Sequence, residues 1–267
     1  MEEEIKRSPF EKRIHEIDFV RGLLMCLVVL DHLFNLLRSF NGGWAGELHT
    51  QPFYAIFQFT DFYWQSPVRT VVRWLCLIAF CFVSGVSCAF SRNNYKRATQ
   101  MIALWAIIFV GSNILESIRA TYDLSLGVKS MRVDFNIIGV LAWSTLIYCF
   151  VQEKSWKWLL VIGIIGLLIH PACVLLSNTE WGKSAYVPFL WRPENQADYM
   201  PLFPYLGFFF AGALLSKFTY SKDKKSYFKR YNWERPICFI GRHSLIIYAS
   251  HFLILIGIFS LVGLFIK

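Results

Sequence analysis

An arginine and a histidine separated by ten residues stand in an apolar run near the start of the chain. The run, Ile17 to Leu37, is long enough for the ~20 residues of helix that cross a bilayer, yet it contains Arg21 and His32. Charged and titratable groups are costly in hydrocarbon and are usually functional where they occur. At about 100° per residue, both side chains fall on one helix face, about 16 Å apart along the axis. The opposite face is apolar, so this helix is expected to aim Arg21 and His32 at the protein interior.

His32 has the properties required of a general base. An ordinary imidazole pKa of about 6.5 lets it take a proton from a hydroxyl or an amine near neutral pH. Asn35 lies one turn further along the same face and could hydrogen-bond the ring or an acceptor. Asp31 points about 100° away, so it cannot be assumed to orient the ring. His251, in the middle of the last apolar run, either acts in the site or bonds across helices, and it completes the candidate catalytic set with His32, Asp31 and Asn35.

Other cations fall into two groups. Arg21 lies near one end of its helix, where a guanidinium can hold a phosphate group. The expected loops on the same side of the membrane add further candidates for this role: Arg92, Arg97 and Arg242. At the other end, Arg69 and Arg73 either extend to the membrane interface or clamp an anionic substrate group. The loop before them contains a third candidate for substrate binding, His49.

The composition indicates the class of protein that holds these residues. Of the 267 residues, 55% are hydrophobic, more than the ~45–50% usual in soluble domains. This predicts an all-α, polytopic transmembrane helical bundle in a single domain. The fourth and sixth of the expected spans are short and could be partly re-entrant. About seven spans are expected, near 17–38, 70–90, 98–118, 135–151, 157–177, 202–219 and 244–266.

The basic residues predict the orientation. Lys and Arg concentrate in alternate loops, which places the N-terminus in the cytoplasm and the C-terminus outside, in a multi-pass protein of the cell membrane. The net charge of +9 is thus explained by topology and contact with anionic lipid, and no nucleic-acid partner is expected. The first apolar run is too long for a cleavable signal, so an anchor is expected there. The segments outside the spans include a cytoplasmic tail (1–16), an external aromatic loop (41–69) and a basic cytoplasmic loop (217–243).

The cysteines do not point to a disulfide framework or a metal site. The chain has seven, an odd number, and none forms a CxxC pair. They are expected to be small core residues, and no metal is expected.

Three stretches carry a resemblance to a known family. They are HEIDFVRGLLMCLVVLDHLFNLL, DYMPLFPYLGFFFAGALLSK and GRHSLIIYASHFLI. In this order they resemble the membrane acyltransferases of the heparan-α-glucosaminide N-acetyltransferase family, and more closely its compact bacterial members. The first stretch is also distantly similar to acyltransferase family 3, through the spacing Arg21, ten residues, His32. The lysosomal enzyme has Asn at the position of His32 and its catalytic His in the following loop, where this chain offers only His49 at a different spacing. Its substrate class is therefore not transferred.

The resemblance implies transfer of an acetyl or other short acyl group from acetyl-CoA or another acyl-CoA to an amine or hydroxyl of a sugar or glycan. Arg21 and His32 take the positions of the Arg and His of the family-3 pattern, and His251 that of the His in the last-helix motif. The alternatives are a proton-coupled transporter or a lipid- or glycan-handling protein, with Asp31, His32 and His251 as a proton relay, or a structural subunit. The sequence leaves open N- or O-transfer, an acyl-enzyme intermediate, and the number of subunits, a homo-oligomer included.

Overall fold

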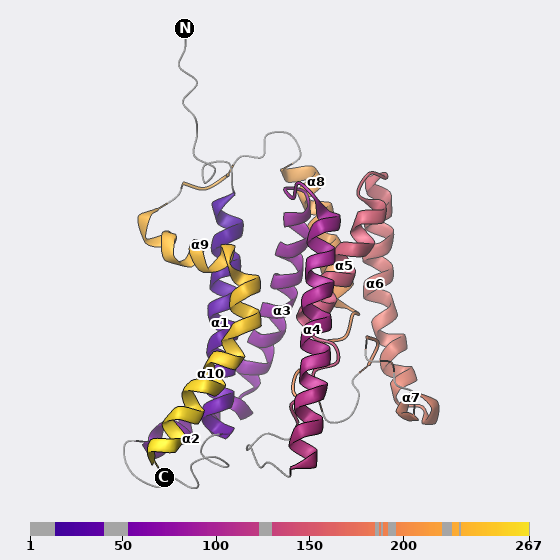
Figure 1. The fold of residues 1–267 in the computed structure, drawn as a ribbon. Coiled ribbons are helices and arrows are strands. Elements are labelled where there is room, and N and C mark those ends of the chain that lie inside the picture. Colours follow the sequence, from indigo (N-terminus) through magenta and orange to yellow (C-terminus); the bar gives the residue numbers. More distant parts are fainter. Residues whose placement is uncertain are drawn as a thin grey trace.

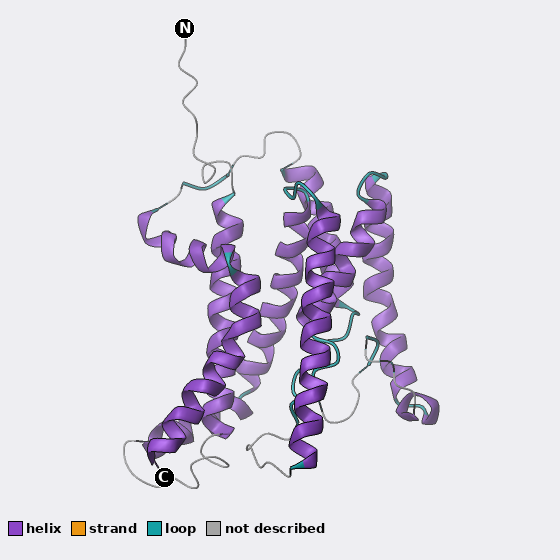
Figure 2. Cartoon of the chain, viewed as in Figure 1, coloured by secondary structure: helices purple, strands orange, loops and turns teal. Residues whose placement is uncertain are grey.

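The computed structural model describes residues 14–39, 53–122, 130–184, 187, 189–191, 196–220, 226–229 and 231–266. These residues form ten α-helices and a single 3-10 turn, Asn232–Glu234, and the described chain contains no strand (Figure 2). The helices are α1 (His15–Ser39), α2 (Phe53–Gln65), α3 (Pro67–Cys88), α4 (Asn94–Thr121), α5 (Ile137–Val151), α6 (Trp156–Ser177), α7 (Glu180–Ser184), α8 (Tyr205–Thr219), α9 (Arg235–Arg242) and α10 (Ser244–Ile266).

Long apolar helices run lengthwise through the bundle (Figure 1). Within the described residues, α1, α3, α4 and α6 are each long and apolar enough to cross a membrane. The last part of the chain adds a fifth candidate, because α9 and α10 satisfy the same test together and are bent by 76°. The prediction of an all-α membrane bundle is confirmed at this level, while the count of seven spans stays a prediction.

The fourth and sixth expected spans contain helices that are too short to cross alone. α5 and α8 have 15 residues each, a length of about 22 Å, against a hydrocarbon core of about 30 Å. Each follows a non-helical segment that contains bends, 130–136 before α5 and 196–204 before α8. The two segments are hydrogen-bonded to each other, from the Ala197 amide to the Arg132 carbonyl at 2.8 Å and from the Met200 amide to the Phe135 carbonyl at 3.0 Å.

A buried carboxylate joins these two segments. Asp134 is completely buried, and its carboxylate accepts hydrogen bonds from Gln196 at 2.7 Å, from Arg132 at 2.9 Å and from Asn113 at 3.3 Å. Gln196 in turn accepts the backbone amide of Asp134 at 3.0 Å. Non-helical backbone and a charge at membrane depth both need partners within the protein. The segment that continues to α8 is therefore held firmly against the segment that precedes α5.

Close helix contacts occur where the sequence has small residues. A Cβ atom on Gly85 of α3 would lie 1.9 Å from the carbonyl oxygen of Phe209 in α8. A Cβ atom on Gly212 of α8 would lie 2.0 Å from the carbonyl oxygen of Phe82 in α3. Both side chains must therefore be absent for the two backbones to touch, as expected of small residues at helix interfaces. Gly85 and Gly212 thus allow α3 and α8 to pack closely.

Two loops expected from the sequence contain helices. Residues 53–65 of the aromatic loop form α2, and α3 begins at Pro67, earlier than the expected span. Within the basic loop, α9 lies across α1 (Figure 1), with Gly241 against the carbonyl oxygen of Asp18 and Gly22 against that of Ile237. This part of the expected basic loop is therefore packed against α1.

Candidate active site

Helices α1, α2, α3, α5 and α10 and the segment before α8 surround a cavity of about 80 Å³. That volume holds several water-sized groups. Most of its wall is apolar, and the polar side chains come from elements distant in sequence. These polar residues are Asp31, His32, Tyr63, Arg73, Asp198 and Tyr248.

Two of the candidate catalytic residues, His32 and His251, are in contact across α1 and α10. His32 Nδ1 lies 2.6 Å from His251 Nε2, and the two ring planes differ by 24°. The ring centres are 4.8 Å apart, close to the nitrogen–nitrogen distance plus two ring radii. The two nitrogens therefore point at each other along the line between the ring centres, as a hydrogen bond requires. His251 is buried behind His32, which itself lines the cavity.

The backbone of α10 determines which nitrogens carry protons. His251 Nδ1 lies 2.7 Å from the carbonyl oxygen of Tyr248 and 3.2 Å from that of Ile247. A carbonyl can only accept, so Nδ1 carries the proton, and Nε2 of a neutral His251 is an acceptor. His32 Nδ1 must then be the donor in the contact between the rings. We infer that His32 Nε2 keeps its lone pair, which makes it the basic atom of the pair.

Asp31 belongs to a separate, closed cluster. Its carboxylate receives two hydrogen bonds from Arg69, at 2.7 and 2.9 Å, and one from the Tyr63 hydroxyl at 2.9 Å. The Arg69 guanidinium also lies over the Trp64 ring, 3.4 Å from its centre. Burial and the hydrogen bond to Asp31 raise the pKa of Tyr63 to about 12. Asp31 thus ties α1 to α2 and α3.

A second aspartate lies on the cavity wall. Asp198 accepts a hydrogen bond from the Tyr248 hydroxyl at 3.1 Å and faces Arg73 at 3.8 Å. Neither Asp198 nor Tyr248 is among the residues that the sequence predicts for the site. Two features of the sequence could have identified them. Asp198 begins the DYMP stretch, and Tyr248 lies on the same helix face as His251.

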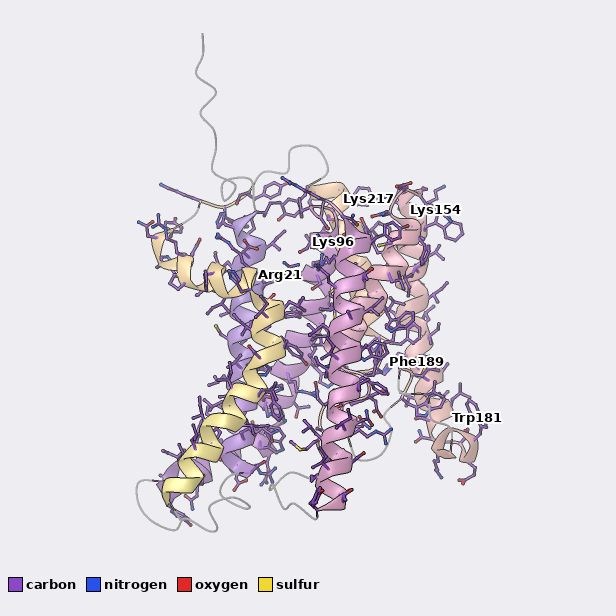
Figure 3. The ribbon with its side chains drawn as sticks, in the orientation of Figure 1. Arg21, Lys96, Lys154, Trp181, Phe189 and Lys217 are labelled. Atoms are coloured by element: carbon purple, nitrogen blue, oxygen red, sulfur yellow. The ribbon has the colours of Figure 1, made fainter. Side chains whose placement is uncertain are left out.

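The expected phosphate-binding arginines are only partly brought together. Arg97 donates to the Cys88 thiol at 3.6 Å. Figure 3 shows Arg21 toward the end of the bundle that also holds Lys96, Lys154 and Lys217. Arg242 instead donates to Asp18 at 3.1 Å, and Arg92 is exposed in the turn between α3 and α4.

Two predicted residues have no assigned contact in the site. Asn35 is half-buried, and its carbonyl accepts the Ser39 hydroxyl at 3.1 Å. His49 lies outside the described residues. Six cysteines are buried and Cys26 is exposed. Within the described part of the chain, no three His, Cys, Asp or Glu side chains are grouped as a metal site would require.

Comparison with known proteins identifies the family. The family described as heparan-alpha-glucosaminide N-acetyltransferase, catalytic, matches residues 47–253, well over half of the chain. This range contains Asp198, Tyr248 and His251, whereas α1 with Arg21 and His32 precedes it. Neither a curated protein nor a solved structure gives a significant match. The similarity to acyltransferase family 3 stays a prediction. The chain belongs to the family of the heparan-alpha-glucosaminide N-acetyltransferase catalytic domain, which implies a membrane acetyltransferase.

Proposed function

We propose that this protein is an integral membrane acyltransferase with His32 as its general base. It moves an acetyl or other short acyl group from acyl-CoA to an amine or hydroxyl of a sugar or glycan. The observation that carries the proposal is the hydrogen bond from His32 to His251 at the wall of the cavity. Family membership supports acetyl transfer, and the pair of rings supplies the base that such a transfer needs.

The reaction assigns a separate task to each ring. His32 Nε2 takes the proton from the acceptor while the acceptor oxygen or nitrogen forms a bond to the thioester carbonyl carbon. The carbon–sulfur bond then breaks, the acyl group stays on the acceptor, and the CoA thiolate takes the proton back from His32. During the reaction, His32 is an imidazolium whose Nδ1–H donates to His251 Nε2. His251 therefore stabilises the charge that develops and keeps the correct tautomer between turnovers.

The donor is proposed to bind from the end of the bundle that holds Arg21. Arg97 follows Lys96 near the start of α4, and Arg21 lies toward the same end of the bundle as Lys96 (Figure 3). A guanidinium pair suits the phosphates of CoA. From there, the acyl-carrying arm would follow α1 for about 16 Å to reach His32.

The proposed topology has seven crossings, with the N-terminus in the cytoplasm of a cell-membrane protein. Lys96, Lys154 and Lys217 gather at the end of the bundle toward which Arg21 lies, which supports a cytoplasmic face there (Figure 3). The non-helical segments 130–136 and 196–204 would complete the crossings that α5 and α8 leave short. The donor would then arrive from the cytoplasm and the acceptor from the opposite side.

Labelled acetyl-CoA tests this proposal directly. Purified protein in lipid nanodiscs should transfer label to a sugar acceptor or release it as free acetate, and His32→Ala should lower the rate by about 10²–10⁴-fold. His170→Ala is the matched control, because His170 is half-buried in α6 and is not among the residues that line the cavity. No transfer or release by the wild type, together with proton-coupled uptake in proteoliposomes, would favour the transporter instead.

A further inference from the structure

Two arginines one turn apart on α3 have the same kinds of partner. Arg69 faces Asp31, which also accepts a hydrogen bond from Tyr63. Arg73 faces Asp198, which also accepts one from Tyr248. Each cluster therefore contains an arginine, an aspartate and a tyrosine, drawn from different elements of the fold.

The first cluster is closed. Arg69 and Asp31 form two direct hydrogen bonds, and their side chains are only 13% and 14% exposed. The face of the Arg69 guanidinium is covered by Trp64. Asp31 and Tyr63 also line the cavity, but a ligand that took Asp31 or Arg69 as its charged partner would have to break a buried, bidentate ion pair, which is costly. We assign this cluster to holding α1, α2 and α3 together.

The second cluster is open and lies on the cavity wall. The closest nitrogen–oxygen distance between Arg73 and Asp198 is 3.8 Å, longer than a hydrogen bond, and their side chains are 41% and 29% exposed. Both line the cavity together with His32. A polar gap of this size suits a bridging hydroxyl group or water molecule.

We propose that Asp198 and Arg73 bind hydroxyl groups of the acceptor, and that this acceptor presents a neutral, polyhydroxylated ring at the pair. The inference rests on the proposed function and names the substrate chemistry of the same site. A hydroxyl donates to the carboxylate and accepts from the guanidinium at the same time. An anionic group bound to Arg73 would be repelled by the carboxylate of Asp198. A cationic group bound to Asp198 would likewise be repelled by Arg73. This differs from the anion clamp that Arg73 alone suggests.

The test compares three glycosides that share one ring: methyl β-D-glucoside, methyl β-D-glucosaminide and methyl β-D-glucuronide. Acetyl transfer by the wild type should favour the glucoside over the glucuronide. Asp198→Asn and Arg73→Gln should each raise KM for the glucoside by about tenfold or more, since each removes a hydrogen bond to a charged group. The KM for acetyl-CoA should stay unchanged, and kcat should change much less than KM.

Controls separate binding from folding. Arg38→Gln removes the exposed ion pair with Asp61, 42% and 48% exposed, and should leave every KM unchanged. Should Asp198→Asn fail to fold, Arg73→Gln still tests the inference, because Arg73 is the more exposed partner.

Direct binding keeps this inference separable from the enzymatic proposal. Saturation-transfer difference NMR should detect methyl glucoside on the wild type and lose most of the signal with Arg73→Gln. If no acceptor is acetylated but this loss occurs, the enzymatic proposal fails and the hydroxyl clamp stands. Preference for the glucuronide, or unchanged KM and NMR signal in both variants, would overturn the clamp.

Discussion

Replacing His251 by Phe tests how the two rings divide their task. The change keeps an aromatic ring in the buried position of His251 but removes the Nε2 acceptor that lies 2.6 Å from His32 Nδ1. A hydrogen bond to a charged group contributes about 1.5–3 kcal/mol, so losing it when His32 becomes an imidazolium should lower kcat by about 10- to 150-fold. His251→Gln should recover part of the rate, because the amide oxygen can accept the same proton. Single-turnover transfer from labelled acetyl-CoA measures these rates without product release.

The double variant gives the decisive comparison. If His251 acts only through His32, then His32→Ala with His251→Phe should be no slower than His32→Ala alone. Multiplicative losses would show that His251 acts independently of His32. A wild-type kcat for His251→Phe, in protein with an unchanged melting temperature, would refute the assignment of tautomers.

Further predictions concern stability and topology. Asp31→Asn should destabilise the protein by about 3–5 kcal/mol, since it leaves Arg69 buried without its carboxylate, whereas the exposed Arg38→Gln should cost less than about 1 kcal/mol; thermal unfolding of purified protein measures both. Gly85→Leu should prevent α3 and α8 from packing, while Gly111→Ala, where a Cβ atom meets nothing within 4 Å, should be neutral or stabilising by up to about 1 kcal/mol; the yield of monodisperse protein and its melting temperature check this pair. Reporter fusions should place the N-terminus in the cytoplasm and the C-terminus outside, and equal accessibility of the two ends would contradict the proposed seven crossings.

The long helices were predictable because hydrophobicity alone determines them. The apolar runs around α1, α3, α4 and α6 exceed the length that a bilayer requires, whatever their neighbours are. The non-helical segment before α5 was not predictable in the same way. Its backbone hydrogen-bond partners, such as Ala197 for Arg132, are some 65 residues further along the chain. No local sequence pattern predicts this pairing.

The same distinction applies to the candidate site. His32 and His251 could be selected because a titratable side chain in an apolar run is rare enough to be informative. Asp198 lies in a polar stretch of the sequence, where a carboxylate is common and does not by itself indicate a functional site. Only the fold brings it to Tyr248 and Arg73, from α10 and α3. The separation of Asp31 from His32 was suggested by helix geometry, but its pairing with Arg69 required the packing of α1 on α3.

The pairing of Asp134 with Gln196 bears on how the chain is assembled during synthesis. When α5 leaves the ribosome, the Asp134 carboxylate can already bond to Arg132 and Asn113. Its third partner, the side-chain amide of Gln196, has not yet been synthesised. A translocon would therefore have to retain this part of the chain, or leave it at the protein–lipid boundary, until residues 196–204 emerge. Premature termination between α6 and α8 should yield a product that quality-control proteases remove, even though four long apolar helices are already complete.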